Sequence, residues 1–247
     1  MNINVDIYDS LGERWYTAED DPVALLRAEH RARIPWILKY LKPNNDVLDL
    51  GCGGGLLTNQ LALSGTFSLF GVDQSEAALT TARRHIPNTA ISTPHYIVGQ
   101  ADQLPFSKHQ FDVILAMDFL EHIENPEKIF KEVARILKPN GYFLTHTFNR
   151  GFLSKWLVIK AVERFIPNTP KDLHVYSMFI RPEEQNQWAK KHGLILKEQW
   201  GLNPKISLKQ AQYILLKRRV SSDFSFQKSK KITTGYCSAY KMEHYNA

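Results

Sequence analysis

An apolar run that ends in a glycine-dense turn constrains this chain more than any other feature. Val47 to Leu50 fits a strand buried in a parallel sheet, and Gly51, Cys52 and then Gly53 to Gly55 follow it. Glycines remove side chains where backbone must approach a ligand closely. A second apolar run ends at Asp73. In a βαβ unit, a carboxylate about 20 residues after the glycine turn lies beside that turn and is placed to bind the hydroxyls of a ribose. The sequence therefore predicts a ligand site at the carboxyl edge of a parallel sheet.

Strand and helix signals alternate along most of the chain. Apolar runs predict strands at 47–50, 70–73, 96–98, 111–117, 142–148, 194–199 and 233–242. Helical signals lie between them at 56–63, 76–85, 126–137 and 182–193. Regular alternation is typical of a parallel sheet covered on both faces, with ligands at the carboxyl ends of its strands. The pattern predicts an α/β fold with a Rossmann-like, mostly parallel seven-stranded sheet and helices on both faces.

Further segments are expected to flank that core. A basic helix should begin near Pro22, and Pro35 should kink or end it. An apolar, basic helix of about four turns at 152–166 is too short to span a bilayer and follows the fifth strand as a lid. Residues 205–231 are rich in lysine and arginine but show no clear period, so no element is predicted there. We expect one domain, with a helical N-terminal cap (1–43), a cofactor-binding core (44–148), a lid or acceptor segment (149–193) and C-terminal strands with a basic insertion (194–247).

Composition narrows the class of protein. The 247 residues include 31 basic and 25 acidic side chains, and the net charge of +6 suits a nucleic acid or anionic lipid surface but is too modest to prove either. Cys52 and Cys237 lie far apart, so no disulfide framework is expected and a reducing cytosol fits. The start lacks a signal-peptide pattern, and no run approaches the roughly 20 apolar residues of a membrane span. We expect a cytoplasmic protein that is at most peripheral on the inner face of a membrane.

The spacing inside the glycine turn selects among ligands. A dinucleotide fingerprint would need glycine where Leu56 stands, and the chain has no G-K-[ST] phosphate cradle. Asp49, two residues before Gly51, would repel a pyrophosphate but suits a ligand with an ammonium-bearing amino-acid end. S-adenosylmethionine carries that ammonium group and a sulfonium, so an acidic binding edge favours it.

These motifs resemble the class I S-adenosylmethionine-dependent methyltransferases. The resemblance implies that the methionine part of the cofactor lies on Gly51 and Gly53, while Asp73 binds the ribose hydroxyls. Asp102 would reach the adenine amino group, and Met117 would line the pocket. The predicted cofactor-binding residues are Arg33, Asp49, Gly51, Gly53, Asp73, Gln74, Asp102, Gln103 and Met117.

A narrower resemblance, to the ubiquinone-biosynthesis O-methyltransferases, covers most of the chain. That family methylates catechol-type hydroxyls on polyprenylated rings. The resemblance implies that Arg33 meets the methionine carboxylate, although the Asn-Pro pair usual before this arginine is absent, and residues 209–229 look inserted. The motifs that carry it are Met117 to Ile123, Leu137 to Gly141, Thr147 to Arg150, His174 with Phe179 to Pro182, and Gly201 to Pro204.

Methyl transfer to a phenol requires alignment of the acceptor and removal of its proton. An unperturbed phenol has a pKa of about 10, so a base or a metal that favours the phenolate would raise the rate. Asp118, Glu121 and His122 share one face if their segment is helical, and the resemblance implies a divalent metal there. Magnesium or manganese would suit these ligands, and zinc less so. Alternatively, Glu121 and His122 form a substrate wall without metal. The candidate catalytic residues are Glu121, His122 and His174.

Three functions are open to such a chain. The first is S-adenosylmethionine-dependent methyl transfer to a phenolic or catechol hydroxyl, with a ubiquinone-precursor ring as the candidate acceptor. The second is a paralogous methyltransferase for another small molecule. The third is a basic nucleic-acid-binding protein that uses Lys217 to Arg219, although such clusters are more often solvated faces and no nucleic-acid partner is expected. The helix at 152–166 either covers the acceptor pocket or rests on a membrane surface. No oligomeric state is predicted.

Overall fold

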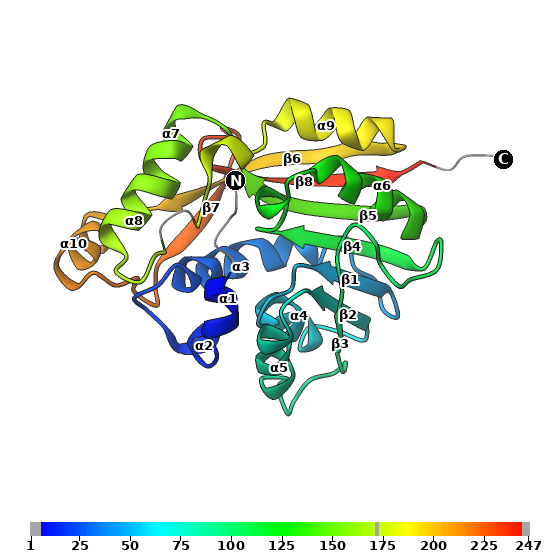
Figure 1. Cartoon of the computed structure of the whole chain (residues 1–247), viewed down its shortest axis with the longest axis horizontal. Coiled ribbons are helices and arrows are strands. Elements are labelled where there is room, and N and C mark those ends of the chain that lie inside the picture. Colours follow the sequence, from blue (N-terminus) through cyan, green and yellow to red (C-terminus); the bar gives the residue numbers. More distant parts are fainter. Residues whose placement is uncertain (1–5, 171–172, 244–247) are drawn as a thin grey trace.

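Strands and helices alternate in the computed structural model, which describes residues 6–170 and 173–243 (Figure 1). The strands are β1 (Asp46–Leu50), β2 (Ser68–Asp73), β3 (His95–Val98), β4 (Phe111–Met117), β5 (Leu137–Phe148), β6 (Leu194–Lys205), β7 (Ser225–Ser229) and β8 (Gly235–Met242). The α-helices are α1 (Asp6–Ser10), α2 (Arg14–Thr17), α3 (Val23–Ile37), α4 (Leu56–Ala62), α5 (Glu76–Arg84), α6 (Pro126–Ile136), α7 (Phe152–Ser154), α8 (Val162–Phe165), α9 (Pro182–Lys191) and α10 (Leu208–Lys217). Short 3-10 helices lie at η1 (Leu120–His122) and η3 (Tyr176–Met178), and a π-helix lies at η2 (Lys155–Ala161).

All strands belong to one sheet, in the order β3-β2-β1-β4-β5-β8-β6-β7. Strands β1 to β5 are parallel, β8 is antiparallel to both β5 and β6, and β7 is antiparallel to β6. The mostly parallel Rossmann-like prediction is confirmed. The sheet of the described residues has eight strands where seven were predicted, because β7 forms in the basic insertion and adds an edge strand to β6.

Both faces of the sheet are buried, since neighbouring residues of one strand enter different cores. In β1, Leu48 packs in a cluster with Phe130 of α6, whereas Val47 packs in a cluster with Trp36 of α3 and Leu61 of α4. This double coverage explains the continuous apolar runs in the sequence.

Helix α3 runs through Pro35, which was expected to kink or end it. Proline removes one helical hydrogen bond. The next residues, Trp36 and Ile37, are buried in the core that α3 and α4 share with the sheet. The N–H of Leu38 still donates to the carbonyl of Ile34 over 2.9 Å. Burial of these apolar side chains holds the last turn in place.

The segment 152–166 is helical as predicted, but its central part, η2, is π-helical between α7 and α8. The unassigned segment 205–231 contains α10 and β7. Helices α8 and α10 lie at the same end of the molecule in Figure 1. Among the residues that the structure describes, no helix combines the length and apolarity needed to cross a bilayer.

Candidate active site

A cavity of about 1230 Å³ lies along the carboxyl edge of the parallel strands. Its polar part is lined by the turn after β1 and by the ends of β2, β3 and β4. Its apolar part is lined by η2, α8, α10 and the segment that follows α10. Polar-part residues include Asp49, Gly51, Asp73, Asp102 and Met117, and apolar-part residues include Val158, Val162, Ile166, Ile214 and Phe224.

The glycine turn has the backbone that its sequence indicates. Gly51 and Gly53 have φ angles of 68° and 51°, which favour glycine. A Cβ on Gly53 would lie 2.6 Å from the ring of Trp15, which covers the turn from α2. Asp73 accepts the N–H of Gly53 over 2.8 Å and that of Ser75 over 2.9 Å. The predicted juxtaposition of the carboxylate and the turn is therefore confirmed.

The other predicted cofactor residues divide into two sets. Asp49 is buried and accepts the hydroxyl of Thr58 over 2.6 Å, and burial together with the charge of nearby Asp73 raises its pKa to about 7. Gln74, Asp102 and Met117 line the cavity with it. Gln103, which is exposed on the turn after β3, does not line the cavity. The lining glycines, carboxylates and methionine fit a cofactor with an adenosine and an amino-acid end.

Arg33 lies in a different place from the one expected. Its side chain is fully buried beneath the cavity wall and donates to Asp118 over 2.5 Å, with Glu29 at 4.0 Å. The other carboxylate oxygen of Asp118 accepts Nδ1 of buried His146 over 2.5 Å. Burial opposes the charge of Asp118, but Arg33 and His146 outweigh it and hold its pKa well below the usual value. Arg33 is therefore engaged by this chain's own carboxylate and does not line the cavity.

The predicted metal triad does not assemble. Asp118 binds Arg33, and Glu121 turns away to accept the hydroxyl of Thr147 over 2.8 Å. Residues Asp118, Glu121 and His122 occupy a 3-10 turn and the residues before it, so their ligand atoms do not converge. Within 6–170 and 173–243, the group with metal-like spacing is Glu29, Asp118 and His146. The guanidinium beside Asp118 would repel a cation there, so these residues do not fit a divalent metal.

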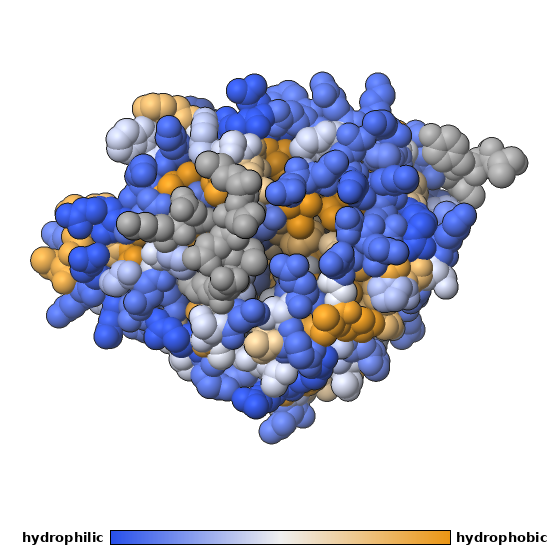
Figure 2. Space-filling view, viewed as in Figure 1, coloured by the Kyte–Doolittle hydropathy of each residue, from blue (hydrophilic) through white to orange (hydrophobic). Residues whose placement is uncertain are grey.

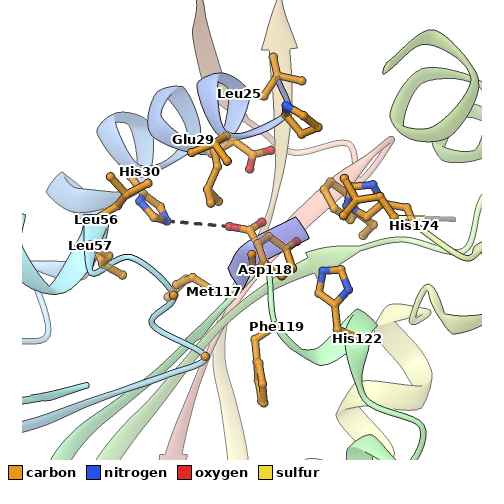
Figure 3. A pocket seen from close by; sticks show the side chains of 18 of the residues that line it. Leu25, Glu29, His30, Leu56, Leu57, Met117, Asp118, Phe119, His122 and His174 are labelled. Atoms are coloured by element: carbon orange, nitrogen blue, oxygen red, sulfur yellow. Dashed lines mark ion pairs between the residues drawn. The ribbon is translucent and has the colours of Figure 1, made fainter. Parts of the chain in front are cut away.

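His122 and His174 line the cavity on one side of Asp118, opposite His30, as Figure 3 shows. Their ring centres are 5.7 Å apart, and Tyr8 from α1 meets the His122 ring edge-on at 6.1 Å. Burial lowers the pKa of His122 to about 4 and that of His174 to about 3, so both rings are neutral at neutral pH. Glu121 is buried outside the cavity lining, and burial with the charge of Asp118 raises its pKa to about 8. The third candidate catalytic residue thus does not line the cavity.

Several lining residues were not predicted. Glu29 and His30 of α3 face the cavity, but a basic helix gave no sign that these two side chains would point there. The wall made by α10 did have a signal, because Ser207 and Gln210 form a capping box that marks a helix start. Tyr8 is brought in by the packing of α1 on α2, where its ring stacks on Trp15 at 5.6 Å.

Comparison with known proteins agrees with this geometry. Residues 48–145 match the family model described as a methyltransferase domain. A ubiquinone biosynthesis O-methyltransferase from Hydrogenovibrio crunogenus is 32% identical over 197 residues, which cover 79% of this chain and 81% of that protein. A protein of the same name from Coxiella burnetii is 32% identical over 201 residues, covering 79% and 83%.

Solved structures share the fold. Magnesium protoporphyrin IX methyltransferase from Synechocystis PCC 6803 superposes with a TM-score of 0.64 at 15% identity, covering 97% of this chain and 96% of that one. An S-adenosylmethionine-dependent methyltransferase from Mesorhizobium loti gives 0.59 at 16% identity, covering 85% and 97%. The matched methyltransferase domain and the two relatives at 32% identity show the family. The chain belongs to the S-adenosylmethionine-dependent methyltransferases, in the family of the ubiquinone biosynthesis O-methyltransferases.

Proposed function

We propose that this methyltransferase acts on the phenolic hydroxyl of a ring that carries a hydrocarbon tail, a ubiquinone-precursor ring being the candidate. The observation that carries the proposal is the two-part cavity. Its polar part meets neutral His122 and His174, and it continues into an apolar part lined by η2, α8 and α10. A tailless phenol would leave that apolar part to water, whereas a hydrocarbon tail would bury it favourably.

The polar part would hold S-adenosylmethionine. Asp73 would accept the ribose hydroxyls, Asp102 would meet the adenine, and the backbone of Gly51 and Gly53 would lie under the methionine part. When bound, S-adenosylmethionine supplies an electrophilic methyl group on a sulfonium that is already a good leaving group. The task of the chain is therefore to align the acceptor oxygen and remove its proton.

His122 and His174 would perform that proton removal. A neutral imidazole can accept a proton, and Nδ1 of His122 is buried without a hydrogen-bond partner among the described residues. Phe148 packs against His174 at 5.1 Å between ring centres and would form one wall of the ring site. Glu121 would act only at a distance, because its carboxyl is held by Thr147.

A methyl-transfer assay with catechols of increasing tail length tests this function. Each methylene that enters the apolar part should add about 0.8 kcal/mol, roughly a fourfold gain in kcat/KM. Ile214→Asn, in the wall, should remove this gain and leave turnover of a tailless catechol unchanged. Gln212→Asn, on the exposed side of the same helix, is the matched control. If no catechol is methylated although S-adenosylhomocysteine binds, the acceptor is a different small molecule.

We also propose that the 152–166 helix contacts a membrane surface, from which a tailed acceptor could enter. Phe152 is 73% exposed and Trp156 is 55% exposed, close to Lys155 and Lys160. Across the apolar part of the cavity, Leu208 and Leu216 of α10 are exposed as well, and Figure 2 shows hydrophobic surface at this end of the molecule. Exposed apolar side chains with flanking lysines suit an anionic bilayer.

Sedimentation with lipid vesicles tests this contact. The full-length protein should sediment with vesicles that contain phosphatidylglycerol and much less with phosphatidylcholine alone. The double variant Phe152→Ser/Trp156→Ser should lose binding, whereas Ile91→Ser, which alters an exposed apolar residue elsewhere, should not. Equal binding by all three proteins would refute a specific contact through this helix.

A further inference from the structure

The position of the cofactor along the sheet edge follows from the strand order. Asp102 follows β3, Asp73 ends β2, and the glycine turn follows β1, in the spatial order β3-β2-β1-β4. Adenine near Asp102 and ribose at Asp73 leave the amino-acid end over β1 and the end of β4. That end carries an ammonium group and a carboxylate. Asp49 is available for the ammonium, so the carboxylate needs a donor in the same region.

Arg33 cannot be that donor in this arrangement. Its side chain has no exposed surface and does not line the cavity. Its Nη2 donates to Asp118 over 2.5 Å, and Nε and Nη1 are buried without a hydrogen-bond partner among the described residues. Among the described residues that line the cavity, the basic side chains are His30, Lys128, His122 and His174. Burial and the charge of Arg33 lower the pKa of His30 to about 3, so its ring would meet a carboxylate as a neutral N–H donor.

Position separates these candidates. Figure 3 shows His30 on the opposite side of Asp118 from His122 and His174, whose ring centres lie 5.7 Å apart and away from the ends of β1. Lys128 is an exposed residue of α6. His30 projects from α3 above Leu56, Leu57 and Met117, and Nε2 lies 4.0 Å from Asp118. His30 is thus the donor beside the ends of β1 and β4.

The surroundings of His30 would tolerate a carboxylate. Arg33 pairs with Asp118, whose Oδ2 lies 4.0 Å from Nε2 of His30, and so offsets its negative charge. Burial and the charge of Asp118 raise the pKa of Glu29 well above its usual value, because both disfavour its charged form in this site. Nδ1 of His30 is buried without a hydrogen-bond partner among the described residues, so the ring has unused hydrogen-bonding capacity.

We propose that His30 receives the methionine carboxylate of the cofactor, in the place that family resemblance gives to Arg33. Arg33 then supports this site indirectly by holding Asp118. The proposal rests on the cofactor placement given above, and it concerns no property of the methyl acceptor. It predicts that His30 distinguishes ligands that have the amino-acid end from ligands that lack it.

Calorimetry on the full-length protein, without acceptor, tests the proposal. S-adenosylhomocysteine has the amino-acid end, and 5′-methylthioadenosine lacks it. His30→Leu should weaken S-adenosylhomocysteine binding by roughly tenfold or more and leave 5′-methylthioadenosine binding unchanged. His30→Gln, which keeps an N–H donor, should recover part of the loss. The unchanged ligand also serves as the check that the variant is folded.

Two results would overturn the assignment. One is equal loss of both ligands, which would indicate a structural role. The other is undiminished S-adenosylhomocysteine binding by His30→Leu. Failure of the wild-type protein to bind either ligand would count against the cofactor site itself, and failure to methylate a catechol would count only against the proposed acceptor.

Discussion

The carboxylate of Asp73 accepts the backbone N–H of Gly53 over 2.8 Å and so joins the end of β2 to the glycine turn after β1. A second backbone N–H, from Ser75, holds its other oxygen over 2.9 Å. Burial raises the pKa of Asp73 in spite of these bonds. The carboxylate is thus fixed at the cavity wall before any ligand arrives, and a rigid acceptor loses little entropy on binding.

Asp73→Ala should therefore weaken S-adenosylhomocysteine binding by roughly 10- to 100-fold, the contribution of hydrogen bonds to a charged group. Isothermal titration calorimetry measures this change. Gln103→Ala, an exposed substitution outside the cavity lining, is the control and should bind as the wild type does. Wild-type affinity in Asp73→Ala would show that the ribose lies elsewhere.

The buried pair of Arg33 and Asp118 should behave as one unit in stability. Arg33→Met removes the guanidinium partner of a buried carboxylate that His146 still contacts, which should lower the free energy of unfolding by about 3–5 kcal/mol. The double variant Arg33→Met/Asp118→Asn should be more stable than the sum of the two single losses implies. Urea unfolding of the four proteins gives the coupling energy, and strictly additive losses would contradict the pairing.

Glu121 should make stability fall with rising pH. The ordinary pKa is 4.5 and the folded pKa is about 8, so between these values the folded state keeps a proton that the unfolded state has released. The stabilisation is complete below pH 4.5 and is lost as the pH rises through about 8. Glu121→Gln cannot release a proton, so the unfolding free energy of this variant should decline less with pH than that of the wild type. The difference between the two slopes should reach about 1.4 kcal/mol per pH unit. Urea unfolding across this range compares the two proteins, and parallel profiles would contradict the raised pKa.

His122 should affect turnover without affecting the cofactor. His122→Ala should lower kcat by roughly 10²- to 10⁴-fold, as expected for loss of a general base, while S-adenosylhomocysteine affinity stays unchanged. Since its pKa is about 4, the wild-type rate should not fall between neutral pH and about pH 5 for lack of a neutral imidazole. His174→Ala makes the comparison within the pair. The variant with the larger loss of kcat identifies the base. Two small losses would show that neither residue accepts the proton.

Local sequence was enough to locate the cofactor edge. The strand from Val47, the turn from Gly51 to Gly55 and the carboxylate of Asp73 lie where the pattern predicted, because βαβ geometry brings the ends of adjacent parallel strands together. Helix α10 could also have been predicted from its capping box. The end of α3 could not, because its burial under the sheet outweighs the effect of Pro35.

By itself, the sequence determined the α/β fold, the places of its first five strands along the chain and the ligand edge, since these depend on hydrophobic periodicity and on glycine at fixed spacing. Only the tertiary structure decided the partners of charged side chains. It turned Arg33 inward to Asp118, separated Glu121 from His122, and left His30 facing the cavity. The physical reason is that a buried charge must find a partner close in space, and sequence spacing does not specify which residues meet across elements.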